Sequence, residues 1–213
     1  MQGFVFFAVA GINLFVATIY FWMLIRKRSK PALAMWLFFS LAVVMSLITY
    51  LKQGNYSFWD NALNTADLAL TVSVTIAILV WGDKSSCFNR FDLVCLLVVA
   101  GIILFWIITQ NHLVTNMGIQ LIMIIAYLPV VKRMLASKEN YEPFAIWIAL
   151  TIAPFISLLT SKGILASIYA FRAIVCSALL LALMVRIERL NRKSGRRPSG
   201  YWGMCTEDAR REP

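Results

Sequence analysis

Charged residues are scarce in this chain of 213 residues. Only 14% of the sequence is Asp, Glu, Lys or Arg, whereas 61% is hydrophobic, and the mean hydropathy is +0.76. A soluble domain of this length could not hide so much apolar surface in one core. The composition therefore excludes an ordinary soluble protein and predicts a membrane protein.

Residues that build metal sites and active sites are also scarce. His112 is the single histidine, and no CxxC pattern joins the four cysteines, which are Cys87, Cys95, Cys176 and Cys205. Most metal sites and a disulfide framework are therefore excluded. The sequence has no Walker loop, no GxSxG and no HExxH. We predict a protein that is not an enzyme and that carries no metal and no cofactor.

Long apolar runs are abundant instead, and a run of about 20 apolar residues predicts a transmembrane helix. Backbone groups in lipid must be satisfied internally, so each run is expected to be helical. The predicted fold class is all-α, a polytopic membrane protein with seven transmembrane helices. The expected spans are 4–25, 32–51, 61–82, 93–109, 117–131, 144–160 and 164–186, of which the fifth can extend back to Leu113.

The distribution of Lys and Arg predicts the orientation of these spans. The connections after spans one, three and five hold four, two and three basic residues, and the tail from Arg186 holds eight; the opposite side has only Lys52 and Lys162. This bias places the tail in the cytoplasm and the N-terminus outside. The net charge of +10 therefore reflects topology and predicts no nucleic-acid partner. The tail could also attract anionic lipids of the bilayer.

Two stretches 111 residues apart are nearly the same. Residues 34–49 (AMWLFFSLAVVMSLIT) and 145–160 (AIWIALTIAPFISLLT) share six of sixteen positions. The match continues toward the N-terminus of each copy if the connection in the second copy is four residues longer. Tyr20 then aligns with Tyr127, and Asn13 aligns with Gln120. We predict two parallel three-helix repeats joined by a linker helix. The expected units are 1–82, the linker 83–112, the second repeat 113–186, and a basic, disordered tail over 187–213.

The segment YLPVVKRMLASKENYEPFAIW (127–147) resembles the signature of the PQ-loop and SWEET-like transporter superfamily. That superfamily has a three-plus-one-plus-three plan of helices, and the chain is most similar in pattern to its small bacterial members. The resemblance implies a bacterial inner-membrane location and a hinge at Pro129, followed by a basic loop and Trp147. Val130 stands where the family signature has glutamine, and Trp22 stands in the first copy where the second has Pro129.

Two ionisable side chains lie inside the spans, Asp67 in span three and Arg172 in span seven. They lie on equivalent helices at similar depths and could pair between the repeats. Charges within the membrane are costly and usually face the protein interior. The stripe that contains Asp67 also includes Asn64, Thr71 and Thr75, and the face of Arg172 includes Tyr169. We predict a substrate or proton-coupling site formed by Asp67, Arg172, Asn13, Gln120, Asn64, Thr71 and Tyr169; a static ion pair that locks the bundles is the alternative.

Aromatic and proline residues complete the candidate site. In the resembled sugar transporters an aromatic residue stacks on the substrate at the place of Trp36 and Trp147. Their depth here favours anchors at the membrane interface. Pro129 and Pro154 are the predicted hinges, because proline removes a helix hydrogen bond.

The predicted function is a membrane transporter that moves a small polar solute by alternating access. The alternative is a non-transporting receptor or scaffold subunit on the same fold. A wet cavity lined by Asn13, Asp67, Gln120 and Arg172 would favour transport, whereas a dry interface would favour a scaffold. The sequence leaves a homo-oligomer open and does not name the solute.

Overall fold

The computed structural model describes residues 1–213 except 27–32, 82–89, 129–130, 132–133, 136–143 and 194–213. The described residues form seven α-helices, one short 3-10 helix and no strand. The helices are α1 (Gln2–Ile25), α2 (Leu33–Gln53), η1 (Phe58–Asn61), α3 (Ala62–Trp81), α4 (Arg90–Thr109), α5 (His112–Ile125), α7 (Phe144–Leu158) and α8 (Gly163–Lys193).

Four of these segments are long and apolar enough to cross a membrane: Gln2–Ile25, Trp36–Gln53, Phe58–Trp81 and Gly163–Arg192. The other three apolar helices, Leu93–Thr109, His112–Ile125 and Phe144–Leu158, are shorter. Large apolar side chains stand on the outside of the bundle, and Phe4 and Phe7 on α1 are 81% and 69% exposed. Lipid accommodates such a surface at no cost, whereas water does not. The described helices therefore have the lengths and the apolar outer surface of an integral membrane protein.

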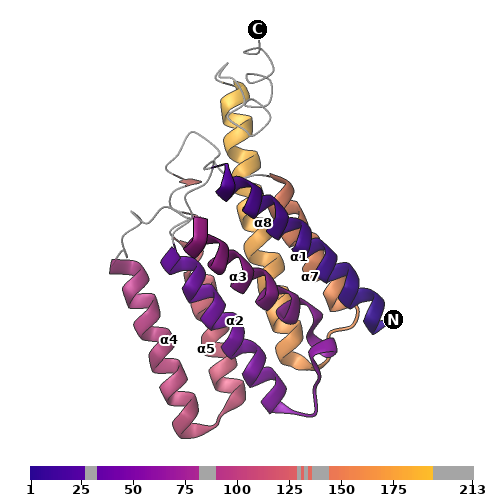
Figure 1. Cartoon of the computed structure of the whole chain (residues 1–213), viewed down its shortest axis with the longest axis vertical. Helices are drawn as coiled ribbons and strands as arrows, with labels where there is room; N and C mark the ends of the chain where they lie inside the picture. Colours follow the sequence, from indigo (N-terminus) through magenta and orange to yellow (C-terminus); the bar gives the residue numbers. More distant parts are fainter. Residues whose placement is uncertain (27–32, 82–89, 129–130, 132–133, 136–143, 194–213) are drawn as a thin grey trace.

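Successive helices run in opposite directions (Figure 1). The N-terminus and the α2–α3, α4–α5 and α7–α8 connections lie at one end of the bundle, which we call the N-terminal end. The end of α8 lies at the opposite end. Helices α1, α3, α5 and α8 therefore run one way, and α2, α4 and α7 run the other way.

Neighbours in the bundle are not neighbours in the sequence. Helix α3 packs between α1 and α2, and α8 packs against α7 and, less extensively, against α5. Helix α1 also packs against α7, and α2 packs against α5. Helix α4 lies outside this ring of six helices, against α5 and α2. We call α1, α2, η1 and α3 the first half, and α5, α7 and α8 the second half.

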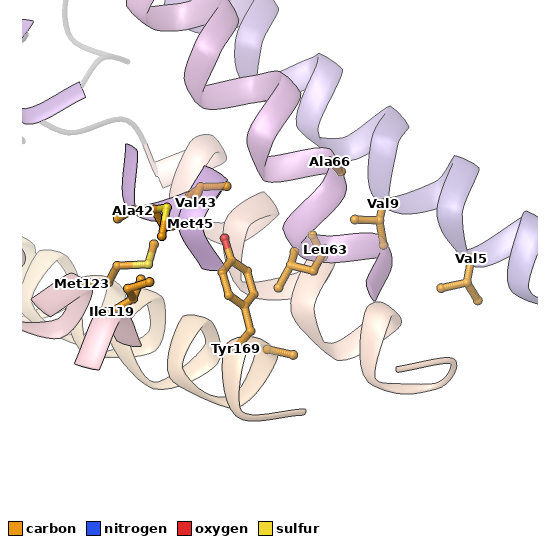
Figure 2. Packing of buried hydrophobic residues seen from close by; sticks show 12 residues of the cluster. Val5, Val9, Ala42, Val43, Met45, Leu63, Ala66, Ile119, Met123 and Tyr169 are labelled. Atoms are coloured by element: carbon orange, nitrogen blue, oxygen red, sulfur yellow. The ribbon is translucent and has the colours of Figure 1, made fainter. Parts of the chain in front are cut away.

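A shared apolar layer joins both halves (Figure 2). It is built from buried side chains of the first half and the second half, including Val5, Val9, Ala42, Val43, Met45, Leu63, Ala66, Ile119, Met123, Ala153 and Tyr169. Tyr169 is 1% exposed, and its ring extends from α8 into this layer. Its hydroxyl is therefore placed where a polar partner must be supplied by another helix.

Most helix boundaries lie within a few residues of the sequence prediction, and the ends of α5 and α8 show what determines them. Helix α5 begins at His112, next to the Leu113 to which the predicted span could extend, because Asn111 caps it: the Asn111 side chain accepts a hydrogen bond of 3.1 Å from the Val114 amide. Helix α8 continues to Lys193, although the prediction ended it at 186 and began a disordered tail there. Ile187 on this extension is 4% exposed, so packing supports it. The tail after Pro198 lies outside the described residues.

Candidate functional site

Asp67 receives two hydrogen bonds from helices other than its own. The Asn13 side-chain Nδ2 donates to Asp67 Oδ1 at 2.8 Å, from α1. The Tyr169 hydroxyl donates to Asp67 Oδ2 at 2.9 Å, from α8. Each carboxylate oxygen thus has one neutral donor, and Asp67 connects the first half to the second half.

Arg172 lies one helical turn beyond Tyr169 and is 6% exposed. Its Nε donates to Gln120 Oε1 at 2.8 Å, and its guanidinium carbon lies 4.8 Å from the centre of the Tyr169 ring. Tyr169 therefore contacts both charged residues, through its hydroxyl and through its ring. Asp67 and Arg172 form no direct ion pair. The sequence analysis gave a direct pairing as one possibility, and the structure instead connects the two residues through neutral side chains.

Gln120 is held in place by polar side chains of α2 and α5. Its Nε2 donates to Ser46 Oγ at 3.0 Å and to Asn116 Oδ1 at 3.2 Å. Asn116 in turn donates to Thr49 Oγ1 at 2.8 Å and to the Ser46 carbonyl at 2.9 Å. Because its amide nitrogen is bound there, the Oε1 of Gln120 is directed at Arg172. Ser46, Thr49 and Asn116 were not among the predicted site residues.

The polar side chains that share a face of α3 with Asp67, namely Asn64, Thr71 and Thr75, divide into two groups. Asn64 contacts Ser46 Oγ at 3.0 Å in either orientation of its amide, which joins it to the residues above. Thr71 instead bonds the Leu68 carbonyl in its own helix at 3.3 Å, and Thr75 pairs with Ser40 of α2 at 2.9 Å. We call Asn13, Ser46, Thr49, Asn64, Asp67, Asn116, Gln120, Tyr169 and Arg172 the central network. Thr71 borders this network and has no hydrogen bond to it.

One acceptor in the central network lacks a donor. Asn13 is 3% exposed, and its Oδ1 has no hydrogen-bond partner among the described residues. A buried amide oxygen without a donor costs free energy of about 1–3 kcal/mol. The network therefore has room for one further donor beside Asp67.

The two tryptophans make matching contacts that differ from the anchor prediction. Trp147 is 9% exposed and packs among Leu180, Met184 and Ile187 of α8, so it faces the bundle and not the membrane interface. Its ring meets Tyr127 edge-on at 6.3 Å. Trp36 is partly buried and meets Tyr20 edge-on at 5.1 Å. The sequence depth of a residue did not show that a neighbouring helix would cover it.

Of the predicted hinges, Pro154 lies inside α7 and is buried, whereas Pro129 lies outside the described residues. A proline within a helix removes one backbone hydrogen bond, so α7 has a point at which it bends more easily. Pro154 follows Ala153, which belongs to the shared apolar layer.

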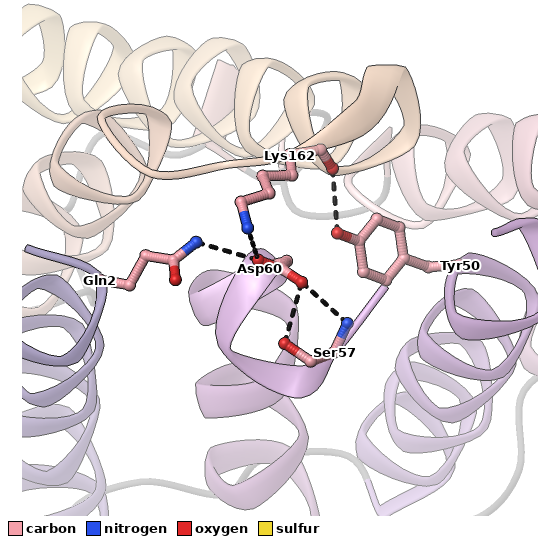
Figure 3. A network of polar contacts seen from close by, with 5 residues as sticks. All are labelled: Gln2, Tyr50, Ser57, Asp60 and Lys162. Carbon is pink, nitrogen blue, oxygen red and sulfur yellow. Dashed lines mark hydrogen bonds and ion pairs between the residues drawn. The ribbon is translucent and has the colours of Figure 1, made fainter. Parts of the chain in front are cut away.

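A second polar cluster closes the N-terminal end of the bundle (Figure 3). Asp60 Oδ1 pairs with Lys162 Nζ at 2.8 Å and accepts from Gln2 Nε2 at 2.9 Å. Asp60 Oδ2 accepts from the backbone and the hydroxyl of Ser57, both at 2.9 Å. Tyr50 donates to the Lys162 carbonyl at 2.9 Å. We call these five residues the end cluster.

The end cluster joins the two halves of the chain. Asp60 and Tyr50 belong to the first half, and Lys162 lies in the α7–α8 connection of the second half. A backbone hydrogen bond of 3.0 Å from Lys162 to the Asp60 carbonyl adds to the ion pair. Sequence analysis missed this cluster, although Ser57 and Asp60 form a capping box whose spacing is visible in the sequence. The pairing with Lys162 left no signal, because it joins two separate connections.

An open surface groove of about 570 Å³ lies between α1 and α7. Its lining is apolar and includes Phe7, Gly11, Ile12, Ile148 and Ile152. Asn13, Asp67, Gln120 and Arg172 do not line it, so it is not the polar cavity that the sequence analysis named as the mark of a transporter. No group of three or more metal-ligating residues occurs in the described part of the chain.

Comparison of the chain with protein-family models, with curated proteins and with solved structures gave no match. The assignment to the PQ-loop and SWEET-like superfamily therefore stays a prediction.

Proposed function

We propose that this chain is a membrane transporter that moves a small polar solute by alternating access between its first half and its second half. The two halves are proposed to be parallel repeats, with α4 as the linker helix and the central network as the solute or coupling site. The observation that carries this proposal is a pair of matching amide–charge contacts. Asn13 of α1 binds Asp67 of α3, and Gln120 of α5 binds Arg172 of α8, both at 2.8 Å.

The amides of those contacts occupy aligned positions of the sequence repeat, and the two charges lie on equivalent helices. Asn13 and Gln120 align, and each binds the charged residue on the third helix of its own half. An amide can donate to an acid and accept from a base, so one type of side chain serves both charges. Opposite charges on equivalent helices are what a duplicated unit would present at a shared, charge-balanced site.

Two further contacts also repeat. The aligned pairs Tyr20–Trp36 and Tyr127–Trp147 both meet edge-on, at 5.1 and 6.3 Å. Ser40 aligns with Thr151, and each bonds a hydroxyl on the third helix of its half at 2.9 Å: Ser40 with Thr75, and Thr151 with Ser177. Such agreement between polar and aromatic contacts supports duplication better than apolar similarity does.

The order of the helices supports the same proposal. In each half the third helix contacts both others, as α3 does with α1 and α2, and α8 with α5 and α7. Across the halves, α1 packs on α7 and α2 packs on α5. Exchanging α1 with α5, α2 with α7 and α3 with α8 leaves this pattern of principal contacts unchanged. Because α1 and α5 run in the same direction, the proposed relation is a rotation about the membrane normal.

Alternating access requires contacts between the halves that can be exchanged. The Tyr169–Asp67 hydrogen bond is such a contact, because Asp67 keeps its Asn13 partner when the halves separate. The end cluster closes the N-terminal side, which the charge distribution places outside the cell. We therefore propose that the structure represents a state closed to the outside, in which the central network is packed and holds no solute.

A scaffold or receptor is the second candidate function, and one observation favours it. The charged groups of the central network are already hydrogen-bonded within the chain, Asp67 to Asn13 and Tyr169, and Arg172 to Gln120. In a scaffold these hydrogen bonds would only hold the halves together. A scaffold would take up no solute, and substitution of Asp67 would lower only the stability of the protein.

The proposed location is a bacterial inner membrane with the N-terminus outside. Arg186, Arg189 and Arg192 are exposed on the last turns of α8 and would meet anionic head groups on the cytoplasmic side. A homo-oligomer stays a prediction, as does the absence of a nucleic-acid partner.

The experiment that tests transport is uptake into proteoliposomes. The purified chain is reconstituted and offered radiolabelled sugars, amino acids, carboxylic acids and vitamins. We expect at least one solute to enter faster than into empty liposomes. Asp67→Asn should abolish this uptake, whereas Thr18→Ala, on the exposed side of α1, should preserve it. Uptake of no solute class, or full uptake by Asp67→Asn, would reject the proposed site.

A further inference from the structure

We propose that Arg172 binds the carboxylate of a small solute that also carries a hydroxyl or ammonium donor. This proposal deepens the proposed function by naming a class of solute, and its transport aspect rests on that function. Binding itself does not depend on transport and can be measured separately. The probes for binding are L-lactate, propionate and their neutral amides.

The guanidinium of Arg172 is held by three neighbours: the Gln120 amide, the Tyr169 ring and the Tyr127 hydroxyl, which also bonds the Arg172 side chain. Its five N–H donors lie in one plane, and Nε–H is used by Gln120 Oε1. Its central carbon lies 4.8 Å from the centre of the Tyr169 ring. Five N–H donors exceed the acceptors that Gln120 and Tyr127 provide, and a guanidinium fork matches the two oxygens of a carboxylate. The side chain of Arg172 is therefore preorganised for a ligand.

No carboxylate of the described chain neutralises this cation directly. Asp67 is the acidic group nearest in the network, and its two oxygens are bonded to Asn13 and to Tyr169. Arg172 is 6% exposed, so water compensates little of its charge. A buried charge without a paired counter-charge is costly, and an incoming carboxylate would supply the missing partner.

Gln120 acts as a positioning residue that orients Arg172 and does not neutralise its charge. Its amide nitrogen is bound to Ser46 and to Asn116, which points the oxygen at Nε. A glutamate in this place would neutralise Arg172 permanently. The neutral amide therefore holds the guanidinium and keeps it available for an anion.

The solute must also carry a hydrogen-bond donor, because Asn13 presents an acceptor that has no partner among the described residues. Its Oδ1 is a buried acceptor without a partner in the described chain, and its Nδ2 is bound to Asp67. A hydroxyl or an ammonium of the solute would satisfy that oxygen. The same carboxylate of Asp67 repels a second negative charge, so a monoanion or a zwitterion fits better than a dianion.

The test measures binding to the full chain in lipid nanodiscs by calorimetry and by thermal unfolding. L-lactate should bind and raise the unfolding temperature, propionate should bind more weakly, and lactamide and propionamide should have no effect. Equal effects of acids and amides would overturn the proposal. Equal affinities of lactate and propionate would overturn its donor requirement.

Three variants locate the site. Gln120→Glu places a carboxylate against Arg172 and should abolish lactate binding, whereas Gln110→Glu, the same change on an exposed connection, should not. Asp67→Asn removes a repelling charge and should strengthen lactate binding by about tenfold, a Coulomb effect at short range. Retained binding in Gln120→Glu, or weaker binding in a folded Asp67→Asn protein, would overturn the assignment to Arg172.

Parallel uptake measurements separate this inference from the proposed function. Lactate binding without uptake of any solute would leave the anion site standing and reject the transporter. Uptake of a neutral solute without carboxylate binding would leave the transporter standing and reject the anion site.

Discussion

Removal of the Tyr169 hydroxyl tests the contact that joins Asp67 to the second half. Tyr169→Phe keeps the ring that packs in the shared apolar layer and deletes only the donor to Asp67 Oδ2, which lies at 2.9 Å. Hydrogen bonds to charged groups contribute about 1.5–3 kcal/mol in proteins. Interhelical hydrogen bonds in a membrane protein average about 0.6 kcal/mol and reach about 1.7. We therefore expect the free energy of unfolding to fall by about 1–2 kcal/mol.

The assay is reversible unfolding in mixed micelles, followed by circular dichroism, with a double-mutant cycle. In an Asp67→Asn background the acceptor is neutral, so Tyr169→Phe should cost only about 0.5 kcal/mol, and the coupling should be about 1 kcal/mol. Tyr56→Phe is the matched control, because its hydroxyl has no hydrogen bond to a described residue, and it should cost little. An unchanged stability of Tyr169→Phe, or an equal cost in both backgrounds, would refute the proposed role of this contact.

The remaining predictions concern the end cluster, a turn and the topology. Gly163 has φ +78°, and a Cβ there would lie 2.6 Å from the Tyr56 hydroxyl, so Gly163→Ala should lower stability by about 1–2 kcal/mol. Gly11→Ala has nothing within 4 Å and should be neutral or stabilising in the same unfolding assay; equal costs at both glycines would contradict the geometry. Cysteines replacing Asp60 and Lys162, whose backbones share a 3.0 Å hydrogen bond, should form a disulfide that stops solute uptake until it is reduced; uptake unaffected by oxidation would argue against a gate. An alkaline phosphatase fusion after Arg197 should be inactive, because the tail is predicted to be cytoplasmic, and an active fusion would reverse the topology.

Much of the bundle was predictable, because apolar runs separated by polar connections define helices directly. Asn13, Asp67, Gln120 and Arg172 stood out for the same reason: polar side chains are rare in these spans, and their cost directs them inward. The structure brings these four residues into one network with Tyr169, while their role in transport stays a prediction.

Other features depend on distances between helices, which the sequence does not contain. Periodicity shows which face of α8 carries Tyr169 and Arg172, but not that the Tyr169 hydroxyl reaches Asp67. Trp147 lies at the depth of an interface anchor, yet α8 covers it. The ion pair between Asp60 and Lys162 joins two connections that are more than a hundred residues apart. Each of these required the packing of α8 and of its preceding connection against the first half.

The most direct test of the central claim is the accessibility of the central network from each side of the membrane. A single cysteine replaces Thr71, which is 8% exposed beside the network, in a chain whose native cysteines are substituted. A membrane-impermeant maleimide is then added to one side of oriented proteoliposomes at a time. Alternating access predicts labelling from both sides in the chain without a cross-link. When an additional 60–162 disulfide cross-links the end cluster, labelling should occur from the cytoplasmic side alone. Labelling from neither side would contradict the transporter and favour a scaffold.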